Sequence, residues 1–127
     1  MPFNPNLLIL IVVAVIVVGF VLLKNRGRVA GSEAEELLKQ GALVIDVRSE
    51  GEYQGRHLPG AINIPLDRLQ SEIAKHAPDK AKPLLLHCAS GMRSGVGAGK
   101  LQGLGYQHVF NLGSYGQAEA VLAAKKP

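Results

Sequence analysis

The sequence predicts an α/β domain, a parallel sheet with helices on both faces, preceded by one long apolar helix. Apolar runs of strand length alternate with helix-like stretches along residues 32–127, a pattern typical of parallel sheets that are covered on both sides. Residues 7–23 contain no charged or strongly polar side chain, and a short basic stretch follows them. The 127 residues therefore suffice for one modest domain and one accessory segment.

The apolar segment at 7–23, LLILIVVAVIVVGFVLL, is predicted to be a transmembrane helix that follows a short tail at 1–6. As a helix it would span about 25 Å, the short end of what a bilayer core requires, and Pro5 suits the first turn. A cleaved signal peptide is the alternative, but the tail holds no Lys or Arg, and Lys24 begins a basic stretch where a cleavage site would belong. A buried core element is disfavoured, because so small a domain could not cover it on all sides.

Three cations, Lys24, Arg26 and Arg28, lie in a predicted linker at 24–31. The positive-inside tendency predicts that the chain crosses the membrane once and that its C-terminal domain lies in the cytoplasm. Without these three of the 14 Lys and Arg residues, 11 remain against 10 Asp and Glu. The net charge of +4 therefore predicts no nucleic-acid partner, although the basic stretch suits anionic lipid headgroups.

The domain at 32–127 begins with a capping-box pattern at 32–35, Ser-Glu-Ala-Glu, which predicts a helix through about Lys39. An apolar run at 42–47, ALVIDV, predicts a buried strand. A second capping box at 49–52, Ser-Glu-Gly-Glu, predicts a short helix. The remaining predicted elements are strands at 61–64, 83–87 and 108–112 and helices at 66–73, 94–104 and 115–124.

The most informative chemistry lies between the strand at 83–87 and the next helix, in the run Cys88-Ala89-Ser90-Gly91-Met92-Arg93. Cys88 is the only cysteine, and a thiol at a strand-to-helix turn meets converging backbone N–H groups and the positive end of the helix dipole. Both effects lower the pKa of a thiol and favour the reactive thiolate. Gly91 permits close approach of backbone or ligand, so a functional Cys88 is preferred over a merely buried one.

Arg93 stands in the first turn of the predicted helix, where a cation is unfavourable to the helix dipole. The position therefore predicts a compensating anion, either a bound anionic substrate or the Cys88 thiolate. His87 precedes the nucleophile, but adjacent strand residues point to opposite faces of a sheet. We therefore interpret His87 as structural.

Asp46 and Arg48 follow the strand at 42–47 and are predicted to form a salt bridge. In parallel α/β sheets, sites lie beyond the carboxyl ends of the strands, so this pair and Cys88 are expected at the same edge. Glu52 is predicted to cap the short helix that follows.

No metal site and no cofactor are predicted. A single cysteine excludes an internal disulfide and a multi-cysteine metal site, and His57, His76 and His108 have no ligand spacing. The run at 95–100, GVGAGK, resembles a phosphate-binding loop only superficially, because Leu101 replaces the Ser or Thr that would hold magnesium. A free thiol also suits a reducing compartment, in agreement with the cytoplasmic placement.

Ordered motifs across residues 30–124 resemble those of rhodanese-like sulfurtransferase domains. They are Ile45-Asp46-Val47-Arg48, Glu52-Tyr53, HLPGAINIP at 57–65, CASGMRS at 88–94 and Val109-Phe110-Asn111-Leu112. The resemblance implies that Cys88 carries sulfur as a persulfide, that Arg93 orients an anionic substrate, and that Asp46 and Arg48 brace the loop. The residues implied to bind substrate are Ala89, Ser90, Gly91, Met92 and Arg93.

Three departures from the family pattern concern the rim of the pocket and substrate access. Arg56 replaces a glycine often found before the histidine of the motif, and Ser114-Tyr115 replaces paired glycines often found after the last strand. The tryptophan common a few residues later is absent, because the chain has none.

Together these features predict a membrane-anchored sulfurtransferase of the thiosulfate sulfurtransferase type. It would move sulfane sulfur from thiosulfate or a persulfide to a thiophilic acceptor, which must be an external thiol because no second cysteine can resolve a Cys88 persulfide. A persulfide carrier or scaffold serving a membrane-protein partner is one alternative. A cysteine phosphatase or arsenate reductase is another, but the resembling phosphatases place five residues between Cys and Arg, whereas four separate Cys88 from Arg93.

Overall fold

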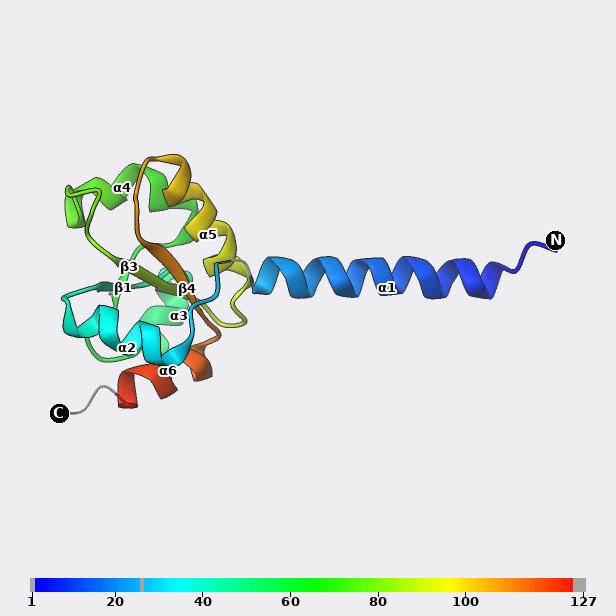
Figure 1. The fold of residues 1–127 in the computed structure, drawn as a ribbon, viewed down its shortest axis with the longest axis horizontal. Coiled ribbons are helices and arrows are strands. Elements are labelled where there is room, and N and C mark those ends of the chain that lie inside the picture. The colour runs from blue at the N-terminus through cyan, green and yellow to red at the C-terminus, as the bar shows by residue number, and fades with distance from the viewer. Residues whose placement is uncertain (1, 26, 125–127) are drawn as a thin grey trace.

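A computed structural model describes residues 2–25 and 27–124 of the chain (Figure 1). Met1, residues 125–127 and Arg26, which belongs to the predicted basic linker, lie outside the described residues. The described chain forms a rounded domain, and one long helix projects from it (Figure 1).

The projecting helix, α1, spans Pro5–Lys24 and so extends the predicted apolar helix slightly at both ends. Pro5 lies in its first turn as predicted, and the Asn4 side chain caps it by accepting hydrogen bonds from the N–H groups of Asn6 and Leu7. No residue of α1 is buried. Within the described part of the chain, α1 is the one helix long and apolar enough to cross a membrane, a property that it shares with signal sequences.

The domain is built on a four-stranded parallel sheet in the order β2-β1-β3-β4. The strands are β1 (Leu43–Asp46), β2 (Ile62–Asn63), β3 (Leu84–His87) and β4 (Val109–Gly113). The first three fall within the predicted strand runs, β4 extends one residue beyond its predicted run to Gly113, and the parallel pairing is the predicted one. Asp46 is in register with Asn63 on one side and His87 on the other. The carboxyl ends of these strands therefore meet at one edge, which positions the site.

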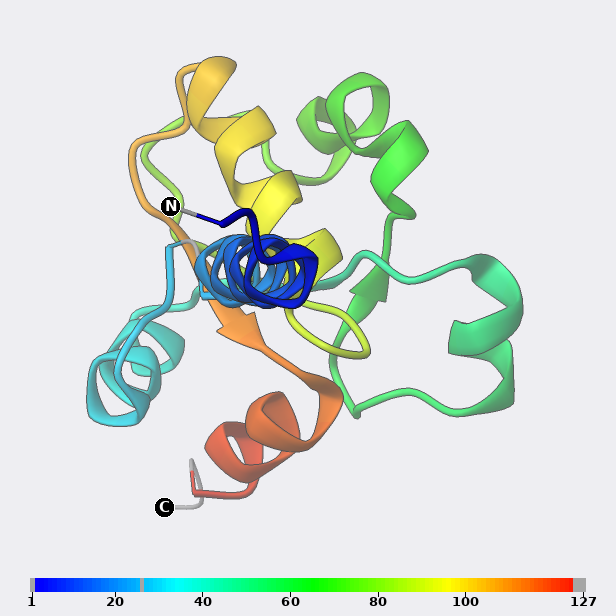
Figure 2. The ribbon, with the colours of Figure 1, turned by 90° about the vertical axis from the view of Figure 1, so that its right-hand side faces the viewer.

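Helices cover both faces of the sheet, as predicted (Figure 2). The elements are α2 (Gly31–Lys39), α3 (Glu50–Gly55), the 3-10 turn η1 (Leu66–Arg68), α4 (Leu69–His76), α5 (Met92–Gly103) and α6 (Tyr115–Ala124). Leu84 and Leu86 of β3 belong to the core beneath α4 and α5, whereas Leu85 belongs to the core beneath α2 and α6. A strand that is buried on both faces is uniformly apolar, which explains the Leu-Leu-Leu run.

The two predicted capping boxes have different outcomes. The one at 32–35 is wrong, because α2 begins at Gly31 after Ala30, which makes no side-chain cap bond. The Ala34 N–H already donates to the Ala30 oxygen over 2.9 Å, so the first turn closes before Ser32 can cap it. The box at 49–52 is confirmed, with reciprocal bonds between the side chains and backbone of its first and last residues.

The predicted linker at 24–31 packs on the domain. The N–H of Asn111 in β4 donates to the Gly27 oxygen over 2.8 Å, and the Val29 N–H donates to the Asn111 oxygen over 3.3 Å. The Val29 side chain is buried in the α2 and α6 core. Residues 27–29 are therefore held against the edge strand.

Candidate active site

Cys88 follows β3 directly, and its side chain is fully buried beneath α5. Its Sγ atom accepts hydrogen bonds from the N–H groups of Gly91, at 3.1 Å, and Ser94, at 3.4 Å. Burial alone would raise the pKa of the Cys88 thiol, but hydrogen bonds from the Ser94 hydroxyl and the backbone N–H groups of Ser94, Gly91 and Ser90 outweigh it. The pKa of Cys88 therefore lies below its usual value, which favours the thiolate nucleophile.

Gly91 begins the turn into α5 with a φ of 95°, a left-handed conformation that glycine adopts without strain. A Cβ atom there would lie 3.1 Å from the Cα of Gly113 and 3.2 Å from the backbone oxygen of Lys24. Both the conformation and the crowding thus require glycine. This turn aims the first N–H groups of α5 at the sulfur, as the sequence predicted for a strand-to-helix junction.

Ser94 and Asn111 form a buried network behind the sulfur that sequence reasoning missed. The Ser94 Oγ lies 3.4 Å from Cys88 Sγ and 2.7 Å from Asn111 Oδ1. A hydroxyl has one proton to donate, so the Ser94 hydroxyl is shared between the sulfur and the Asn111 amide oxygen, whereas the backbone N–H groups are the constant donors to the sulfur. Asn111 Oδ1 also accepts from the Gly113 N–H over 2.8 Å. The sequence feature that could have indicated this network is Asn111 itself, a polar residue inside the apolar strand VFNLG.

Arg93 forms a two-pronged ion pair with Glu52, with N–O distances of 2.7 and 3.0 Å. The sequence predicted an anion beside Arg93, and the structure adds one that the sequence did not point to, the Glu52 carboxylate. Glu52 also caps α3 as predicted. The bonds from Arg93, together with those from Ser49, lower the pKa of Glu52 to about 2. Glu52 therefore holds Arg93 by a full negative charge at neutral pH.

Asp46 and Arg48 form the predicted salt bridge, and it is buried. Arg48 Nη2 lies 2.7 Å from Asp46 Oδ2 and 2.6 Å from the backbone oxygen of Arg56. The Asn63 amide donates to the backbone oxygens of both Asp46 and Arg48 over 3.0 Å. The pair thus connects the ends of β1 and β2 to the chain that leaves α3.

His87 lies on the other side of the sheet from Cys88. Its ring packs edge-on against Tyr115 at 5.9 Å between centroids, next to the core beneath α6. Its Nε2 is 3.9 Å from Asp46 Oδ2, and neither ring nitrogen has a hydrogen-bond partner among the described residues. Burial lowers the pKa of His87, so it is neutral and placed away from the sulfur, as a structural residue should be.

Two departures from the family pattern meet beside the Cys88 loop. The Arg56 guanidinium lies 4.8 Å from the centre of the Tyr115 ring, and the Tyr115 N–H donates to the Ala89 oxygen over 3.2 Å. Arg56 also pairs with Glu119 of α6 over 3.1 Å. An arginine–aromatic contact thus forms between two positions where the family pattern often has glycine, and nothing in the local sequence around either residue pointed to the other.

The structure brings together Cys88, the backbone of 89–93 and Arg93 at the edge that Asp46 and Arg48 brace. Ala89 is exposed, Ser90 and Met92 are partly exposed, and Arg93 also borders a surface cavity of about 340 Å³. Within residues 2–25 and 27–124, no group of three or more His, Cys, Asp or Glu side chains could hold a metal ion. The arrangement can bind a small anion and present one nucleophilic sulfur.

Residues 31–117 match the protein family described as Rhodanese-like domain. Thiosulfate sulfurtransferase PspE of Escherichia coli K12 is 44% identical over 69 residues, which is 54% of this chain and 66%, just under two thirds, of that relative. The uncharacterized protein YqhL of Bacillus subtilis strain 168 is 32% identical over 126 residues, 95% of this chain and 98% of that one.

Solved structures agree with the fold. A structure titled rhodanese with anions from E. coli has a TM-score of 0.59 at 39% identity, covering 61% of this chain and 91% of that one. The human single-domain sulfurtransferase TSTD1 has a TM-score of 0.60 at 27% identity, covering 80% and 98%. The coverage of these single domains is nearly complete, whereas α1 lies outside the 31–117 match.

Proposed function

Because the chain belongs to the rhodanese-like domain family, we propose that it transfers sulfane sulfur through a persulfide on Cys88. One observation carries this proposal. The Cys88 sulfur accepts hydrogen bonds from the backbone N–H groups of Gly91 and Ser94, inside a loop with four residues between Cys88 and Arg93. Named thiosulfate sulfurtransferases among the relatives support the same chemistry.

The first half-reaction forms the persulfide. The Cys88 thiolate attacks the outer sulfur of thiosulfate; a sulfur–sulfur bond forms to Cys88, and the bond to the inner sulfur breaks. Sulfite leaves with that electron pair, and the Cys88 persulfide keeps one negative charge. The N–H groups of the turn stabilise that charge as they stabilise the thiolate, so no general base is required.

The second half-reaction returns the thiolate. A nucleophile such as cyanide attacks the outer persulfide sulfur, leaves as thiocyanate, and the bonding electron pair returns to the Cys88 sulfur. Cys88 is the only cysteine of the chain, so an internal disulfide cannot discharge the persulfide. We therefore propose an external thiol as the cellular acceptor, with the residues of 89–93 binding the anionic donor and Arg93 orienting it.

Steady-state turnover of thiosulfate and cyanide by the full chain tests this function, with thiocyanate as the product measured. Cys88→Ser is expected to abolish turnover and to remove the mass gain of one sulfur atom after thiosulfate treatment. Ser94→Ala, which leaves the nucleophile in place, is the matched control and should keep the mass gain. Full turnover by Cys88→Ser would overturn the proposal, and mass gain without turnover would replace an enzyme by a persulfide carrier.

The membrane anchor is part of the same proposal. α1 is long and apolar enough to cross a bilayer, and Lys24 and Arg28 follow its apolar stretch, which favours a cytoplasmic domain. An alkaline phosphatase fused to the C-terminus should be inactive in cells, because the enzyme requires export. High phosphatase activity would place the domain outside, and release of the chain without α1 would identify a signal peptide.

A further inference from the structure

The end of α1 borders the loop that holds Cys88. The backbone oxygen of Lys24 accepts a hydrogen bond from Asn111 Nδ2 over 2.9 Å, and the same nitrogen donates to the Gly91 oxygen over 3.0 Å. A Cβ on Gly91 would lie 3.2 Å from the Lys24 oxygen, so helix end and loop are nearly in van der Waals contact. The Gly91 N–H in turn lies 3.1 Å from the Cys88 sulfur. One amide side chain thus joins the helix terminus to the site.

The chain after α1 fixes the direction in which the helix leaves the domain. Gly27 and Val29 pair with Asn111 on the edge strand, and Arg28 donates to the Leu112 oxygen over 3.1 Å. With both the helix end and the following residues bonded to β4, the domain has little freedom to turn about α1.

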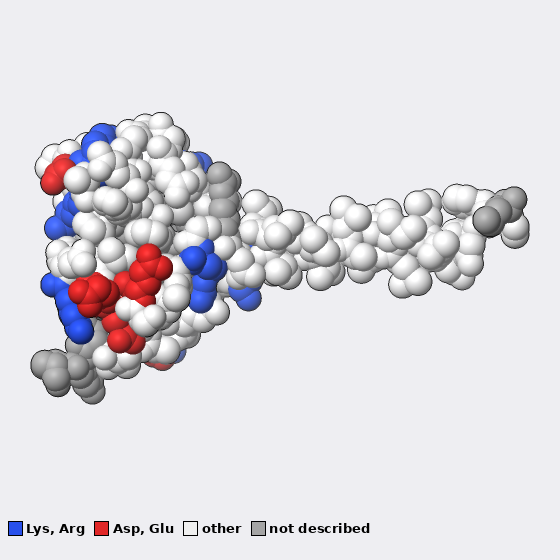
Figure 3. All heavy atoms as spheres, viewed as in Figure 1, with Lys and Arg blue, Asp and Glu red and all other residues white. Residues whose placement is uncertain are grey.

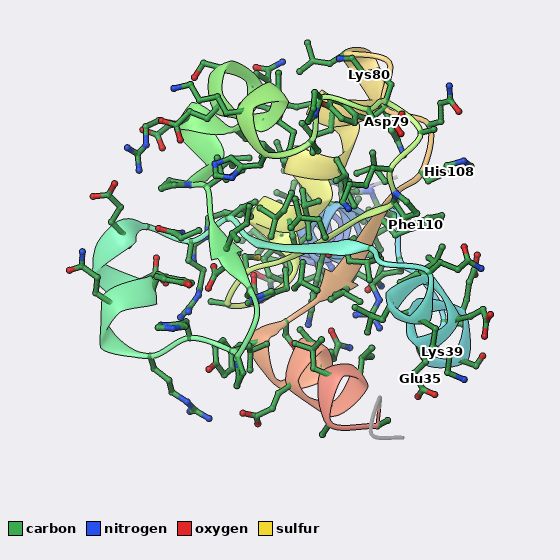
Figure 4. All side chains as sticks on the ribbon, turned by 90° about the vertical axis from the view of Figure 1, so that its left-hand side faces the viewer. Glu35, Lys39, Asp79, Lys80, His108 and Phe110 are labelled. Atoms are coloured by element: carbon green, nitrogen blue, oxygen red, sulfur yellow. The ribbon has the colours of Figure 1, made fainter. Side chains whose placement is uncertain are left out.

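The resulting orientation turns the Cys88 loop toward α1. The view along α1 shows the yellow-green loop after β3 beside the helix, on the same side of the domain (Figure 2). The view from the opposite side labels Lys39 and Asp79 on the face that points away from α1 (Figure 4). The face with the Cys88 loop therefore lies nearer to the medium around α1 than the face with Lys39 and Asp79.

The length and charge of α1 set the depth of the loop. Twenty residues rise about 30 Å, the thickness of a bilayer core, and Lys24 is the cation in its last turn. A lysine at the end of such a helix extends its amine to the headgroup level. Basic side chains border the root of α1, whereas the acidic side chains visible in the same view lie farther from the helix (Figure 3). A loop that Asn111 holds beside the end of α1 consequently lies at headgroup depth.

We infer that the face carrying the Cys88 loop lies against lipid headgroups and that the sulfur acceptor is a thiol held at the bilayer surface by an amphiphilic molecule. This inference rests on the proposed sulfur transfer and membrane span. Asn111 Nδ2 bonds both the Lys24 oxygen and the Gly91 oxygen, so this part of the loop is held beside the helix end and little width remains for a folded partner between it and the headgroups. The headgroup of an amphiphile is already at that depth, and its confinement to the surface raises its effective concentration at the site.

The transfer step is a simple exchange. The acceptor thiolate attacks the outer sulfur of the Cys88 persulfide anion, and a new sulfur–sulfur bond forms on the acceptor. The bond between Cys88 Sγ and that sulfur breaks, and its electron pair remains on Cys88 as the thiolate. The transferred sulfur keeps the negative charge of the persulfide, so no oxidant or reductant is consumed.

Alkylation of the single cysteine tests the placement without requiring sulfur transfer. The full chain is reconstituted in phosphatidylcholine vesicles and treated with a maleimide attached either to a phospholipid headgroup or to the same headgroup without acyl chains. The adduct is measured by intact mass. The control chain combines Cys88→Ser with Lys39→Cys, which puts the single thiol on the far face. We expect the ratio of lipid-tethered to soluble rates to be at least about tenfold higher for Cys88, and equal ratios overturn the inference.

Two further experiments test the junction between α1 and the domain and the nature of the sulfur acceptor. A flexible ten-residue Gly-Ser insertion after Asn25 should lower the Cys88 ratio to that of the far-face control, because it lets the domain leave the surface; an unchanged ratio contradicts the role of the junction. In phosphatidylcholine vesicles that hold the unmutated chain, a thiol-bearing phospholipid should discharge the Cys88 persulfide at least about tenfold faster than the same thiol-bearing headgroup without acyl chains. Equal rates overturn the acceptor assignment. A high alkylation ratio without thiosulfate turnover refutes the proposed sulfur transfer but not the position of the loop at the headgroups. Thiosulfate turnover with an alkylation ratio equal to that of the control refutes the position of the loop but not the sulfur transfer.

Discussion

Two arginine–carboxylate pairs stand at the carboxyl edge of the sheet, and they differ in their access to water. Asp46 and Arg48 are buried, with side-chain exposures of 0% and 9%, whereas Arg93 and Glu52 are 38% and 39% exposed. A buried charge that loses its partner is strongly destabilising, while an exposed pair contributes little to stability and can separate. The buried pair is therefore suited to hold the scaffold, and the exposed pair is suited to exchange one anion for another.

The largest expected effect follows from breaking the buried pair. Asp46→Asn leaves the Arg48 guanidinium in a buried place without its counter-charge, so we expect a loss of about 3–5 kcal/mol in the free energy of unfolding. Urea denaturation of the full chain in detergent micelles, followed by circular dichroism, measures it. The double variant Asp46→Asn/Arg48→Met removes both charges and should cost less than the single one. A single variant within about 1 kcal/mol of the native chain would contradict the structural role.

Removing the cation of the exposed pair should affect activity more than stability. Arg93→Ala takes away charge-assisted hydrogen bonds to an anionic donor, each worth about 1.5–3 kcal/mol, which corresponds to a roughly 10–150-fold lower kcat/KM for thiosulfate. The free energy of unfolding should change by less than about 1 kcal/mol. Arg93→Lys keeps the charge without the fork and should be intermediate. Unchanged kinetics in Arg93→Ala would remove Arg93 from the site.

Removing the anion of the same pair should act in the opposite direction. Glu52→Gln retains a capping side chain but frees Arg93 from competition with a carboxylate. Since exposed pairs are worth about 0.2–1 kcal/mol, KM for thiosulfate should fall by a factor of roughly 1.5–5. Initial-rate kinetics at constant ionic strength measure it, and a raised KM would show that Glu52 aids donor binding.

The smallest expected effect concerns pH and the buried His87 ring, whose Nε2 lies 3.9 Å from Oδ2 of Asp46 in the buried pair. The pKa of His87 is lowered from 6.5 by burial, so the folded chain binds fewer protons than the unfolded one below that pH. Its contribution to stability is complete above pH 6.5 and is lost progressively as the pH falls toward the folded value. The corresponding loss for Glu52 is confined to the range between 4.5 and about 2. His87→Phe should therefore flatten the unfolding free energy between pH 7 and about 5, and an unchanged slope would assign it to another group.

The successes of sequence reasoning share a local origin. The β1 and β3 strands, the Ser49 capping box, the Asp46–Arg48 pair and the cysteine turn each depend on residues within a few positions of one another. The failed capping box at Ser32 is also instructive. Its residue types were suitable, but Ala30 had already closed the turn, because the preceding segment is held on β4.

The sequence by itself determined the parallel α/β architecture, the apolar α1, the position of the lone cysteine and the loop that surrounds it, because periodicity, capping and turn chemistry depend on neighbouring residues. Only the tertiary structure decided the partners of that loop. Arg93 meets Glu52 across 41 positions of sequence, and Asn111 meets Lys24 across 87. The physical reason is the sheet, whose strand order brings distant segments to one edge, so that the residues holding the site and the end of α1 become neighbours only when the chain folds.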